Sequence, residues 1–460
     1  MSGLSSYRTV NPSTGKTEKV FDLETEPQML AKLATAHRLY QDDWRHRSFA
    51  QRRAVIGKAA QILRDNKEKY ARLISIEMGK ILPEAIGETA LAADILAYYA
   101  DHAETFLAPR ELKIASGRAT VLSQPLGVIY CIEPWNFPYY QLARVAGPNL
   151  MAGNVVLAKH APGVPQCALA FEALFREAGA PEGAYTNLFI DNDVSEKLIA
   201  RSEVRGVALT GSERAGSIVA AQAGKALKKS TLELGGSDAF IVLDDADLDE
   251  VIPRAVAGRM SNNGQVCTAA KRMIVHDSLA ADFTARLKEA IGAFRYGDPL
   301  EQGVTHGPMS SEDAMTRALG QIRKAVDHGA TLVTGGQRLA RDGFFMEAAI
   351  LTDVTKTNPI FYEEIFGPAA IIYPVKDEDS AVALANDSPF GLGGSVHTSD
   401  VARGRRLAER IETGMVYIND VTGTAPDLPF GGVKNSGYGR ELSTYGIEEF
   451  INHKLIHAPE

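Results

Sequence analysis

The sequence has few cysteines and no concentrated block of basic residues. Only Cys131, Cys167 and Cys267 occur among 460 residues, without C-x-x-C spacing or a neighbouring histidine cluster. This argues against a disulfide scaffold or a zinc site, and we predict no metal centre. The formal net charge is −8, and no Lys/Arg-rich run is present to bind a phosphate backbone. A nucleic-acid partner is therefore not expected.

Long apolar runs are also missing. Too few consecutive apolar residues occur to span a bilayer, and the amino terminus lacks a basic segment followed by an apolar one. We therefore expect a cytoplasmic protein with no membrane partner. Hydrophobic residues make up 45% of the chain and charged residues 23%, values that are ordinary for a globular protein. A chain of this length is too long for one core, so two or three lobes are expected.

The order of periodic segments predicts an α/β protein. Apolar residues recur at three- and four-residue spacing through most of the first hundred residues, the pattern of amphipathic helices. Strand-like and helix-like segments alternate over 153–229, which is typical of βαβ units in a parallel sheet. A second alternating section, 237–424, predicts another α/β lobe and hence a cleft. The end of the chain, 446–460, contains a short apolar strand whose open edge would suit another subunit.

One cysteine differs from the other two in its surroundings. Cys131 and Cys167 lie in apolar runs, so we interpret them as buried side chains. Cys267 follows "NNGQ" and precedes "TAAKR", which we expect to begin a helix. The free N–H groups and the dipole of a helix amino terminus would lower the thiol pKa and favour a nucleophilic thiolate. A free cysteine in a turn is the alternative interpretation.

Two further polar residues are candidates for chemistry. Glu233 alternates with leucines in "TLELGGSD", and an apolar setting can raise a carboxyl pKa toward the range of a general base. Asn136 lies between prolines in "EPWNFPYY", and its amide could donate to a developing oxyanion. A salt-bridged strand glutamate and a capping asparagine are the structural alternatives. Each signal is weak when it is taken singly.

In combination, the motifs resemble those of the aldehyde dehydrogenase superfamily along almost the whole chain. Seven segments match in order, namely "EPWNFP", "GNVVLAKHAP", "LTGSERAG", "LELGGSD", "NNGQVC", "EEIFGP" and "PFGGVKNSGYGRE". The resemblance is greatest to bacterial NAD(P)-dependent succinate-semialdehyde dehydrogenases. It implies a Rossmann-type cofactor domain (1–108 and 129–235, with 428–444 returning to it), an α/β catalytic domain (236–427) and a small β oligomerisation arm (109–128 and 445–460). A homodimer or homotetramer is expected.

The resemblance also implies a reaction. Cys267 attacks the aldehyde to give a thiohemiacetal, Asn136 and the Cys267 backbone N–H stabilise the oxyanion, and hydride leaves for the nicotinamide. Glu233 then activates water to hydrolyse the thioester, so a free acid is expected as product. Because the residues after Cys267 are "TAAKR", no disulfide switch with a neighbouring cysteine is expected. A thiol esterase that needs no cofactor is an alternative of another class. The presence of all three residues argues against a non-catalytic scaffold.

The cofactor positions follow from the same resemblance. Trp135 and Lys159 match ribose-binding residues, and Gly211 and Ser212 match a helix amino terminus that binds pyrophosphate. Glu364 and Phe366 match the residues that hold the nicotinamide ribose and ring.

One position bears on the choice between NAD and NADP. Relatives selective for NAD carry a glutamate where this chain has Pro162, three residues after Lys159. The missing carboxylate would admit a 2′-phosphate, which Lys159 could contact, although Pro162 cannot donate a hydrogen bond. We expect use of both NADP and NAD.

The substrate pocket is the least specific part of the resemblance. Arg144 matches an arginine that pairs with the distal carboxylate in succinate-semialdehyde dehydrogenases, and a bidentate guanidinium suits that task. Thr424 stands where those enzymes often have a serine. A salt bridge on a helix face is the alternative role for Arg144. The alternative substrates are glutarate semialdehyde and neutral aliphatic or aromatic aldehydes.

Overall fold

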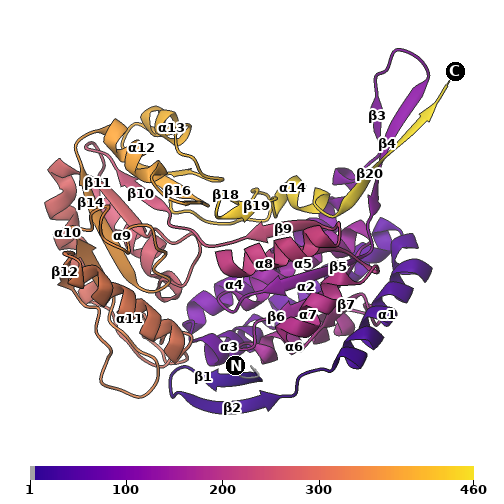
Figure 1. Ribbon diagram of the computed structural model, residues 1–460, viewed down its shortest axis with the longest axis horizontal. Helices are drawn as coiled ribbons and strands as arrows, with labels where there is room; N and C mark the ends of the chain where they lie inside the picture. The colour runs from indigo at the N-terminus through magenta and orange to yellow at the C-terminus, as the bar shows by residue number, and fades with distance from the viewer. Residues whose placement is uncertain (1–5, 460) are drawn as a thin grey trace.

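The computed structural model describes residues 6–459, which form two lobes built on separate, mostly parallel sheets and a narrow arm at one end (Figure 1). The amino-terminal hairpin and helices belong to the larger lobe. Their bounds are β1 (Tyr7–Asn11), β2 (Lys16–Phe21), α1 (Glu26–Asp42), the 3-10 turn η1 (Trp44–His46), α2 (Phe49–Asp65), α3 (Lys67–Met78) and α4 (Leu82–Phe106). The predicted helical character of this region is confirmed. Ser48 shows one local cause, because its hydroxyl accepts from the Gln51 N–H and caps α2.

The larger lobe contains a six-stranded sheet in the order β19-β9-β8-β5-β6-β7. Its strands are β5 (Val128–Glu133), β6 (Val155–His160), β7 (Tyr185–Asn187), β8 (Val204–Thr210), β9 (Lys229–Glu233) and β19 (Gly437–Tyr438), and only β19 runs antiparallel. The accompanying helices are α5 (Pro138–Ala152), α6 (Pro165–Glu177), α7 (Asn192–Ala200) and α8 (Glu213–Lys225). Every residue of β6 is buried, because helices cover both faces of such a sheet.

The smaller lobe contains a seven-stranded sheet in the order β12-β13-β14-β11-β10-β16-β17. Its strands are β10 (Ala239–Val242), β11 (Arg272–His276), β12 (Thr331–Thr334), β13 (Ala349–Thr352), β14 (Ala369–Val375), β16 (Gly394–His397) and β17 (Tyr417–Ile418). The helical elements are α9 (Leu248–Met260), the 3-10 turn η2 (Ser261–Gly264), α10 (Asp277–Gly292), α11 (Glu312–Asp327), α12 (Glu378–Asn386) and α13 (Val401–Ala408). A short antiparallel pair joins β15 (Phe390–Gly391) to β18 (Val433–Lys434). The predicted α/β class is confirmed by these two sheets.

The arm is a three-stranded antiparallel sheet that extends from the larger lobe, with the carboxyl terminus at its tip (Figure 1). It contains β3 (Arg110–Leu112), β4 (Arg118–Pro125) and β20 (Ile451–Ala458), and α14 (Ser443–Glu448) leads into β20. The whole of β20 pairs with β4, which leaves the other side of β20 as one edge of the arm, and β3 forms the other edge. Leu112, Leu455 and Ile456 are exposed apolar side chains on these strands.

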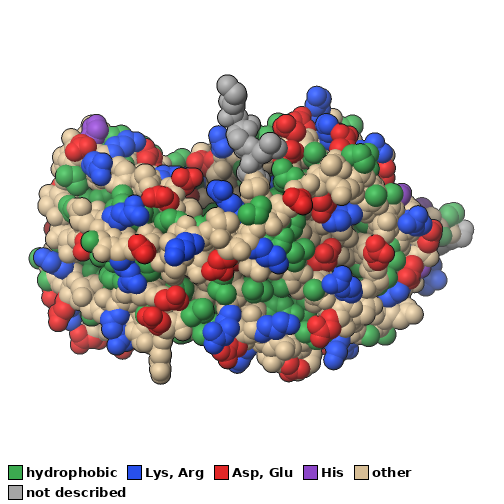
Figure 2. Space-filling view, turned by 90° about the horizontal axis from the view of Figure 1, so that it is seen from below, with side chains coloured by type: hydrophobic (Ala, Val, Ile, Leu, Met, Phe, Trp, Pro, Cys, Tyr) green, Lys and Arg blue, Asp and Glu red, His purple; other side chains and the backbone are tan. Residues whose placement is uncertain are grey.

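The domain boundaries stay a prediction, although the sheets locate the segments they concern. Strand β19, from the segment 428–444, pairs with β9 in the larger lobe, and the arm draws on the segments 109–128 and 445–460. Among residues 6–459, no helix is long and apolar enough to cross a membrane. Basic and acidic side chains are interspersed on the face shown in Figure 2.

Candidate active site

A cavity of about 250 Å³ lies between the two lobes and contains most of the predicted site residues. The larger lobe contributes the end of β5, the end of β8 and the residues that follow β9, and the smaller lobe contributes the turn before β11 and helix α11. The lining residues are Pro134, Trp135, Asn136, Gln141, Thr210, Gly211, Ser212, Leu234, Gly235, Cys267, Ala314, Arg317, Ala318, Gln321, Glu364 and Phe366. Ligand sites at the carboxyl ends of parallel strands follow from this topology.

The turn after β5 positions Trp135 and Asn136. Pro134 ends the strand and Pro138 begins α5, so the two residues lie in a short rigid connection. The indole of Trp135 meets the ring of Phe366 edge to face at 5.8 Å, across the cavity. The Asn136 amide Nδ2 donates to the Gln265 carbonyl at 3.0 Å, which directs it toward the loop that carries Cys267.

The backbone before Cys267 explains the asparagine- and glycine-rich sequence. Asn262, Asn263 and Gly264 are consecutive left-handed residues, with φ of 51°, 52° and 67°. Asparagine and glycine tolerate this region better than other residues, so "NNG" encodes a tight reversal at the end of α9. The reversal is held in place by the Asn262 side chain, which donates to the Asn136 carbonyl at 3.1 Å.

The expected helix after Cys267 is wrong. Cys267 and Thr268 form a turn, and Arg272 already begins β11, a buried parallel strand. The short run "TAAKR" has helix-compatible residues, but pairing of β11 between β10 and β14 overrides that weak preference. The thiol therefore does not lie at a helix amino terminus. The expected lowering of its pKa by such a terminus is wrong as well.

Burial dominates the electrostatics of Cys267. Desolvation raises the pKa of the thiol to about 11. The positive charges of Lys271 and Arg144 lower this pKa, and the negative charges of Glu364 and Asp238 raise it. The other two cysteines are fully buried, as the sequence predicts. Only Cys267 lines the cavity. A nucleophilic role at this position therefore depends on nearby groups that favour the thiolate.

Glu233 lies at the end of β9, outside the lining of the cavity. Its side chain is buried, and within residues 6–459 neither carboxyl oxygen has a hydrogen-bond partner. Burial, followed by repulsion from Glu441, raises the pKa of Glu233 well above its usual value. The carboxyl packs against Gly431, where a Cβ atom would come within 2.7 Å of Oε1. Only the ionised form of this carboxyl can accept a proton, so a role as general base depends on deprotonation of Glu233.

Arg144 is the centre of a buried cluster of charges. Its Nε forms an ion pair with Glu441, and the carboxyls of Glu233 and Glu133 also interact with its charge. Burial and the charge of Glu441 raise the pKa of Glu133 well above the usual range. One arginine thus serves three carboxyl groups, so at least part of the cluster is protonated.

The predicted substrate residues Arg144 and Thr424 are connected through a third side chain. Arg144 Nη1 donates to the Tyr140 hydroxyl at 3.1 Å, and that hydroxyl lies 3.0 Å from Thr424 Oγ1. Arg144 Nη2 donates to Thr210 Oγ1 at 2.8 Å, and Thr210 lines the cavity. Arg144 and Thr424 do not line the cavity themselves. They lie behind it, on α5 and on the segment between β17 and β18.

The predicted cofactor residues are divided between two places. Gly211 and Ser212 line the cavity at the amino end of α8, where Ser212 Oγ accepts from the Ala215 N–H at 3.3 Å. Lys159 and Pro162 lie outside the lining, at and after the end of β6. Burial lowers the pKa of Lys159 to about 8. The Pro162 carbonyl accepts from the Arg8 N–H at 3.0 Å, so the amino-terminal hairpin covers this end of the site.

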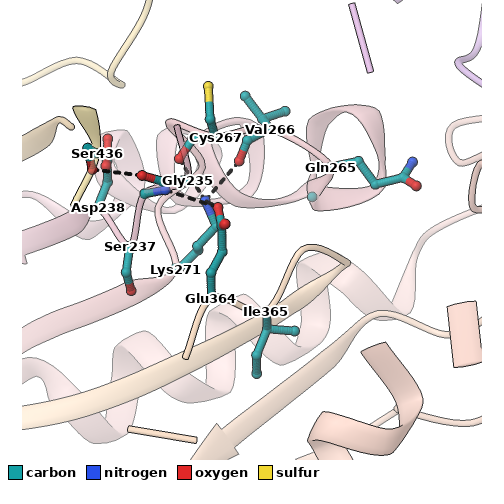
Figure 3. A network of polar contacts seen from close by, with 12 residues as sticks. Gly235, Ser237, Asp238, Gln265, Val266, Cys267, Lys271, Glu364, Ile365 and Ser436 are labelled. Carbon is teal, nitrogen blue, oxygen red and sulfur yellow. Dashed lines mark hydrogen bonds and ion pairs between the residues drawn. The ribbon is translucent and has the colours of Figure 1, made fainter. Parts of the chain in front are cut away.

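Glu364 and Phe366 lie in a loop that precedes β14, and both line the same cavity as Cys267. Figure 3 shows Glu364 beside Lys271, below the turn that carries Cys267. Glu364 Oε1 accepts from the Gly236 N–H at 3.1 Å and pairs with Lys271 Nζ at 3.0 Å. A Cβ atom at Gly235 would collide with Glu364 Oε2, and one at Gly236 would lie 2.6 Å from the Cys267 carbonyl oxygen. The paired glycines of "LELGGSD" are therefore required by close approach of these two groups.

Several residues of the site were not predicted from the sequence. Arg259, fully buried at the end of α9, donates to the carbonyls of Ile365, Gly367 and Ala369 and so fixes the loop around Phe366. Lys271 and Arg317 were also missed, because cations on an α/β scaffold are usually surface residues. A lysine four residues after the candidate nucleophile was the one available signal.

A half-buried thiol, an amide and a helix amino terminus in one cleft between parallel sheets define an α/β enzyme that combines cysteine chemistry with a nucleotide site. The chain belongs to the aldehyde dehydrogenase family, whose family model, described as "Aldehyde dehydrogenase family", matches residues 2–456. The expected resemblance is thereby confirmed.

Individual relatives are similar over nearly the whole chain. A succinate-semialdehyde dehydrogenase [NADP(+)] of Deinococcus radiodurans is 51% identical over 98% of this chain and 94% of its own. The solved structure of Gox0499, described for cofactor and substrate selection, has a TM-score of 0.97 and 62% identity over 98% of this chain and 99% of its own. Succinic semialdehyde dehydrogenase from Streptococcus pyogenes, solved with NADP+, has a TM-score of 0.97 and 46% identity over 99% of this chain and 100% of its own.

Proposed function

We propose that this protein oxidises succinate semialdehyde to succinate with NADP or NAD, and that NADP is preferred. The observation that carries the proposal is one cavity in which Cys267, Asn136 and the residues expected to bind a nicotinamide nucleotide meet. The similarity to succinate-semialdehyde dehydrogenases that use NADP supports the choice of substrate and cofactor. The overall reaction converts aldehyde, NADP+ and water into carboxylate, NADPH and two protons.

In the proposed chemistry, the sulfur of Cys267 forms a bond to the aldehyde carbon, and the carbonyl oxygen takes the electron pair. The Asn136 amide group has two N–H donors, of which the Gln265 carbonyl accepts one at 3.0 Å, and the other donates to that oxygen. The bound nicotinamide supplies the hydride acceptor. Glu233 then removes a proton from water, the water oxygen attacks the thioester carbon, and the carbon–sulfur bond breaks to release the acid and the thiolate.

The residues present fit a dinucleotide. Gly211 and Ser212 bring the amino end of α8 to the cavity, where free N–H groups and the helix dipole suit a diphosphate. Phe366 and Glu364 are proposed to hold the nicotinamide half, and Trp135 and Lys159 the adenosine ribose. Pro162 presents no carboxylate that would repel a 2′-phosphate.

Arg144 and Thr424 are proposed to receive the distal carboxylate of the substrate. Three of the five guanidinium N–H groups are engaged, by Glu441, Tyr140 and Thr210, which leaves one hydrogen on each Nη atom. Tyr140 links this fork to the Thr424 hydroxyl. A carboxylate at this point would add a second anion beside Glu441, so protonation of the glutamate cluster would accompany binding.

The arm supports a proposal about assembly. The exposed apolar residues Leu112, Leu455 and Ile456 lie on strands whose edge is open, and such an edge is usually covered in the native protein. We propose a homodimer or homotetramer that buries the arm, in the cytoplasm.

The direct test records absorbance at 340 nm with succinate semialdehyde and either NADP or NAD, with hexanal and benzaldehyde as uncharged comparisons. Rapid reduction that is selective for succinate semialdehyde is expected. Faster turnover of the uncharged aldehydes would keep the aldehyde dehydrogenase activity and remove the proposed substrate. Reduction with none of them would overturn the proposal and leave ester cleavage to be measured.

Cys267→Ala tests the proposed mechanism, and Cys131→Ala is its matched control. Cys267→Ala should abolish NADPH formation and still bind NADPH, measured by fluorescence, because the thiol is proposed to react and not to hold the cofactor. Cys131→Ala should retain activity, since Cys131 is buried within β5. Full activity of Cys267→Ala would contradict the proposed mechanism.

A further inference from the structure

The most unusual charged group near the cavity is a buried lysine that the proposed chemistry does not use. Lys271 lies immediately before β11 and is 3% exposed. Its ammonium group donates to the Val266 carbonyl at 2.9 Å and to the Cys267 carbonyl at 2.7 Å, and it pairs with Glu364 Oε1 at 3.0 Å. An ammonium group has three N–H donors, so these three contacts use all of them.

The three contacts join two segments whose relative position matters for the proposed reaction. Val266 and Cys267 belong to the turn that carries the nucleophile (the nucleophile turn), which is closed by a hydrogen bond from the Ala269 N–H to the Val266 carbonyl at 3.1 Å. Glu364 comes from the loop proposed to hold the nicotinamide half of the cofactor. Figure 3 shows the Lys271 nitrogen between these groups, with the sulfur of Cys267 pointing away from the network. Lys271 therefore contacts the backbone that carries the nucleophile and does not occupy the space around the sulfur itself.

The surroundings of Lys271 suit a buried ammonium group. A buried ammonium is tolerated only when its hydrogens are satisfied and a counter-charge is near, and both conditions hold here. The Gly236 N–H also donates to Glu364 Oε1, so the carboxylate is fixed from two sides. With an apolar side chain at position 271, the Val266 and Cys267 carbonyls would each lose a donor and Glu364 would lose its ion pair.

We infer that Lys271 is a positioning residue that sets the Cys267 turn and the Glu364 carboxylate together and favours the thiolate through its charge. This inference rests on the proposed role of Cys267 as nucleophile. The charged groups that act on the thiol are Lys271 and Arg144, which favour its ionised form, and Glu364 and Asp238, which oppose it. Lys271 is the one of these four that also contacts the nucleophile turn directly.

The test compares Lys271→Met, which removes the charge at similar length, with Lys271→Arg, which keeps it. Lys324→Met is the matched control. Lys324 forms an ion pair with Glu363, which precedes Glu364 in the same loop, but this pair is partly exposed. The rate of Cys267 alkylation by iodoacetamide is measured from pH 6 to pH 10 by peptide mass spectrometry. This readout requires neither cofactor nor turnover.

Lys271→Met should shift the alkylation profile upward by about one pH unit, which corresponds to roughly tenfold slower alkylation at neutral pH. Lys271→Arg should keep the wild-type profile but lower kcat by about tenfold, because a planar guanidinium cannot direct three donors to the same acceptors. Lys324→Met should match the wild type in both measurements. A wild-type profile and wild-type kcat in Lys271→Met would overturn the inference.

Folding is checked by circular dichroism and thermal melting of each variant. If Lys271→Met does not fold, Lys271→Arg decides the matter, and wild-type kcat in that variant would overturn the inference. Failure of the proposed function is a separate outcome. In that case Cys267→Ala would remain active, whereas failure of the Lys271 inference alone leaves Cys267→Ala inactive and Lys271→Met unchanged.

Discussion

The guanidinium of Arg144 and the carboxylate of Glu441 form an ion pair in the protein interior, behind the wall of the cavity. The pair joins α5 to the segment before α14, which are far apart in sequence. Arg144 therefore has a structural contact in addition to its proposed contact with the substrate. A variant at this position must be measured for stability and for selectivity.

Arg144→Gln should lower kcat/KM for succinate semialdehyde by about 10²-fold, since a lost charge-assisted bidentate contact is worth roughly 3 kcal/mol. The value for hexanal should change far less, because hexanal has no carboxylate. The melting temperature should fall as well, because Glu441 loses its partner while it is buried. Steady-state kinetics with both aldehydes provide the test. An equal decrease for the two would assign Arg144 to structure alone.

Glu233→Gln should slow thioester hydrolysis by about 10²–10⁴-fold, because a positioned base contributes that much. Rapid mixing with NADP should then show an initial burst of NADPH followed by slow turnover. In the wild type, hydrolysis should accelerate as pH rises through the raised pKa of Glu233, since only the ionised form accepts a proton. A pH-independent wild-type hydrolysis rate would contradict this role.

The same carboxyl has a predictable effect on stability. The folded-state pKa of Glu233 is raised, so folding favours the protonated form, and this contribution is lost as pH rises through the folded pKa. Glutamine does not titrate. The melting temperature of Glu233→Gln relative to wild type should therefore increase as pH rises from about 4, near the unfolded-state pKa, until Glu233 is ionised in the folded protein. A difference that stays constant from about pH 4 upward would mean that the carboxyl ionises as easily in the folded protein as in the unfolded one.

Patterns of local sequence were sufficient for the parts of the fold that repeat. The alternation over 153–229 predicted β6, α6, β7, α7, β8 and α8, because each element has its own period and its own turn residues. The helix expected after Cys267 failed because "TAAKR" is too short for propensity to outweigh pairing with β10 and β14. The outcome at such a segment depends on distant strands that a local pattern does not contain.

The candidate site shows the same division. Asn136, Cys267 and Glu364 were found because motifs mark them, whereas Lys271 and Arg259 act through backbone carbonyls and leave no motif. The acid cluster at Arg144 was also invisible, since Glu133 and Glu441 are about three hundred residues apart and meet only in the folded chain. Burial of a charge is a property of the tertiary structure.

Asn136→Ala should reduce kcat by about 10²–10³-fold with little change in the Kd of NADPH, because it removes one donor from the proposed oxyanion site. The amide also contacts the Gln265 carbonyl, so the alkylation rate of Cys267 reports whether the nucleophile turn has moved. An unchanged alkylation rate with reduced kcat is the expected combination. Slower alkylation to the same extent as kcat would assign Asn136 to positioning of the turn.

Pro162→Glu should reverse the cofactor preference from NADP to NAD. The new carboxylate would lie three residues after Lys159, where its charge would repel a 2′-phosphate and could accept from free ribose hydroxyls. The KM for NADP should rise by at least about tenfold, because like charges in contact cost several kcal/mol, while the KM for NAD should fall.

Lys159→Met supplies the complementary measurement. Burial lowers the pKa of Lys159 to about 8, so its charge is present at pH 7 and declines above pH 8. If Lys159 contacts the 2′-phosphate, the KM of the wild type for NADP should rise with pH in this range, and the KM for NAD should rise less. In Lys159→Met the KM for NADP should be high and independent of pH. A wild-type KM for NADP that stays constant from pH 7 to pH 9 would place the 2′-phosphate away from Lys159 and leave the cofactor preference to the missing carboxylate at Pro162 alone.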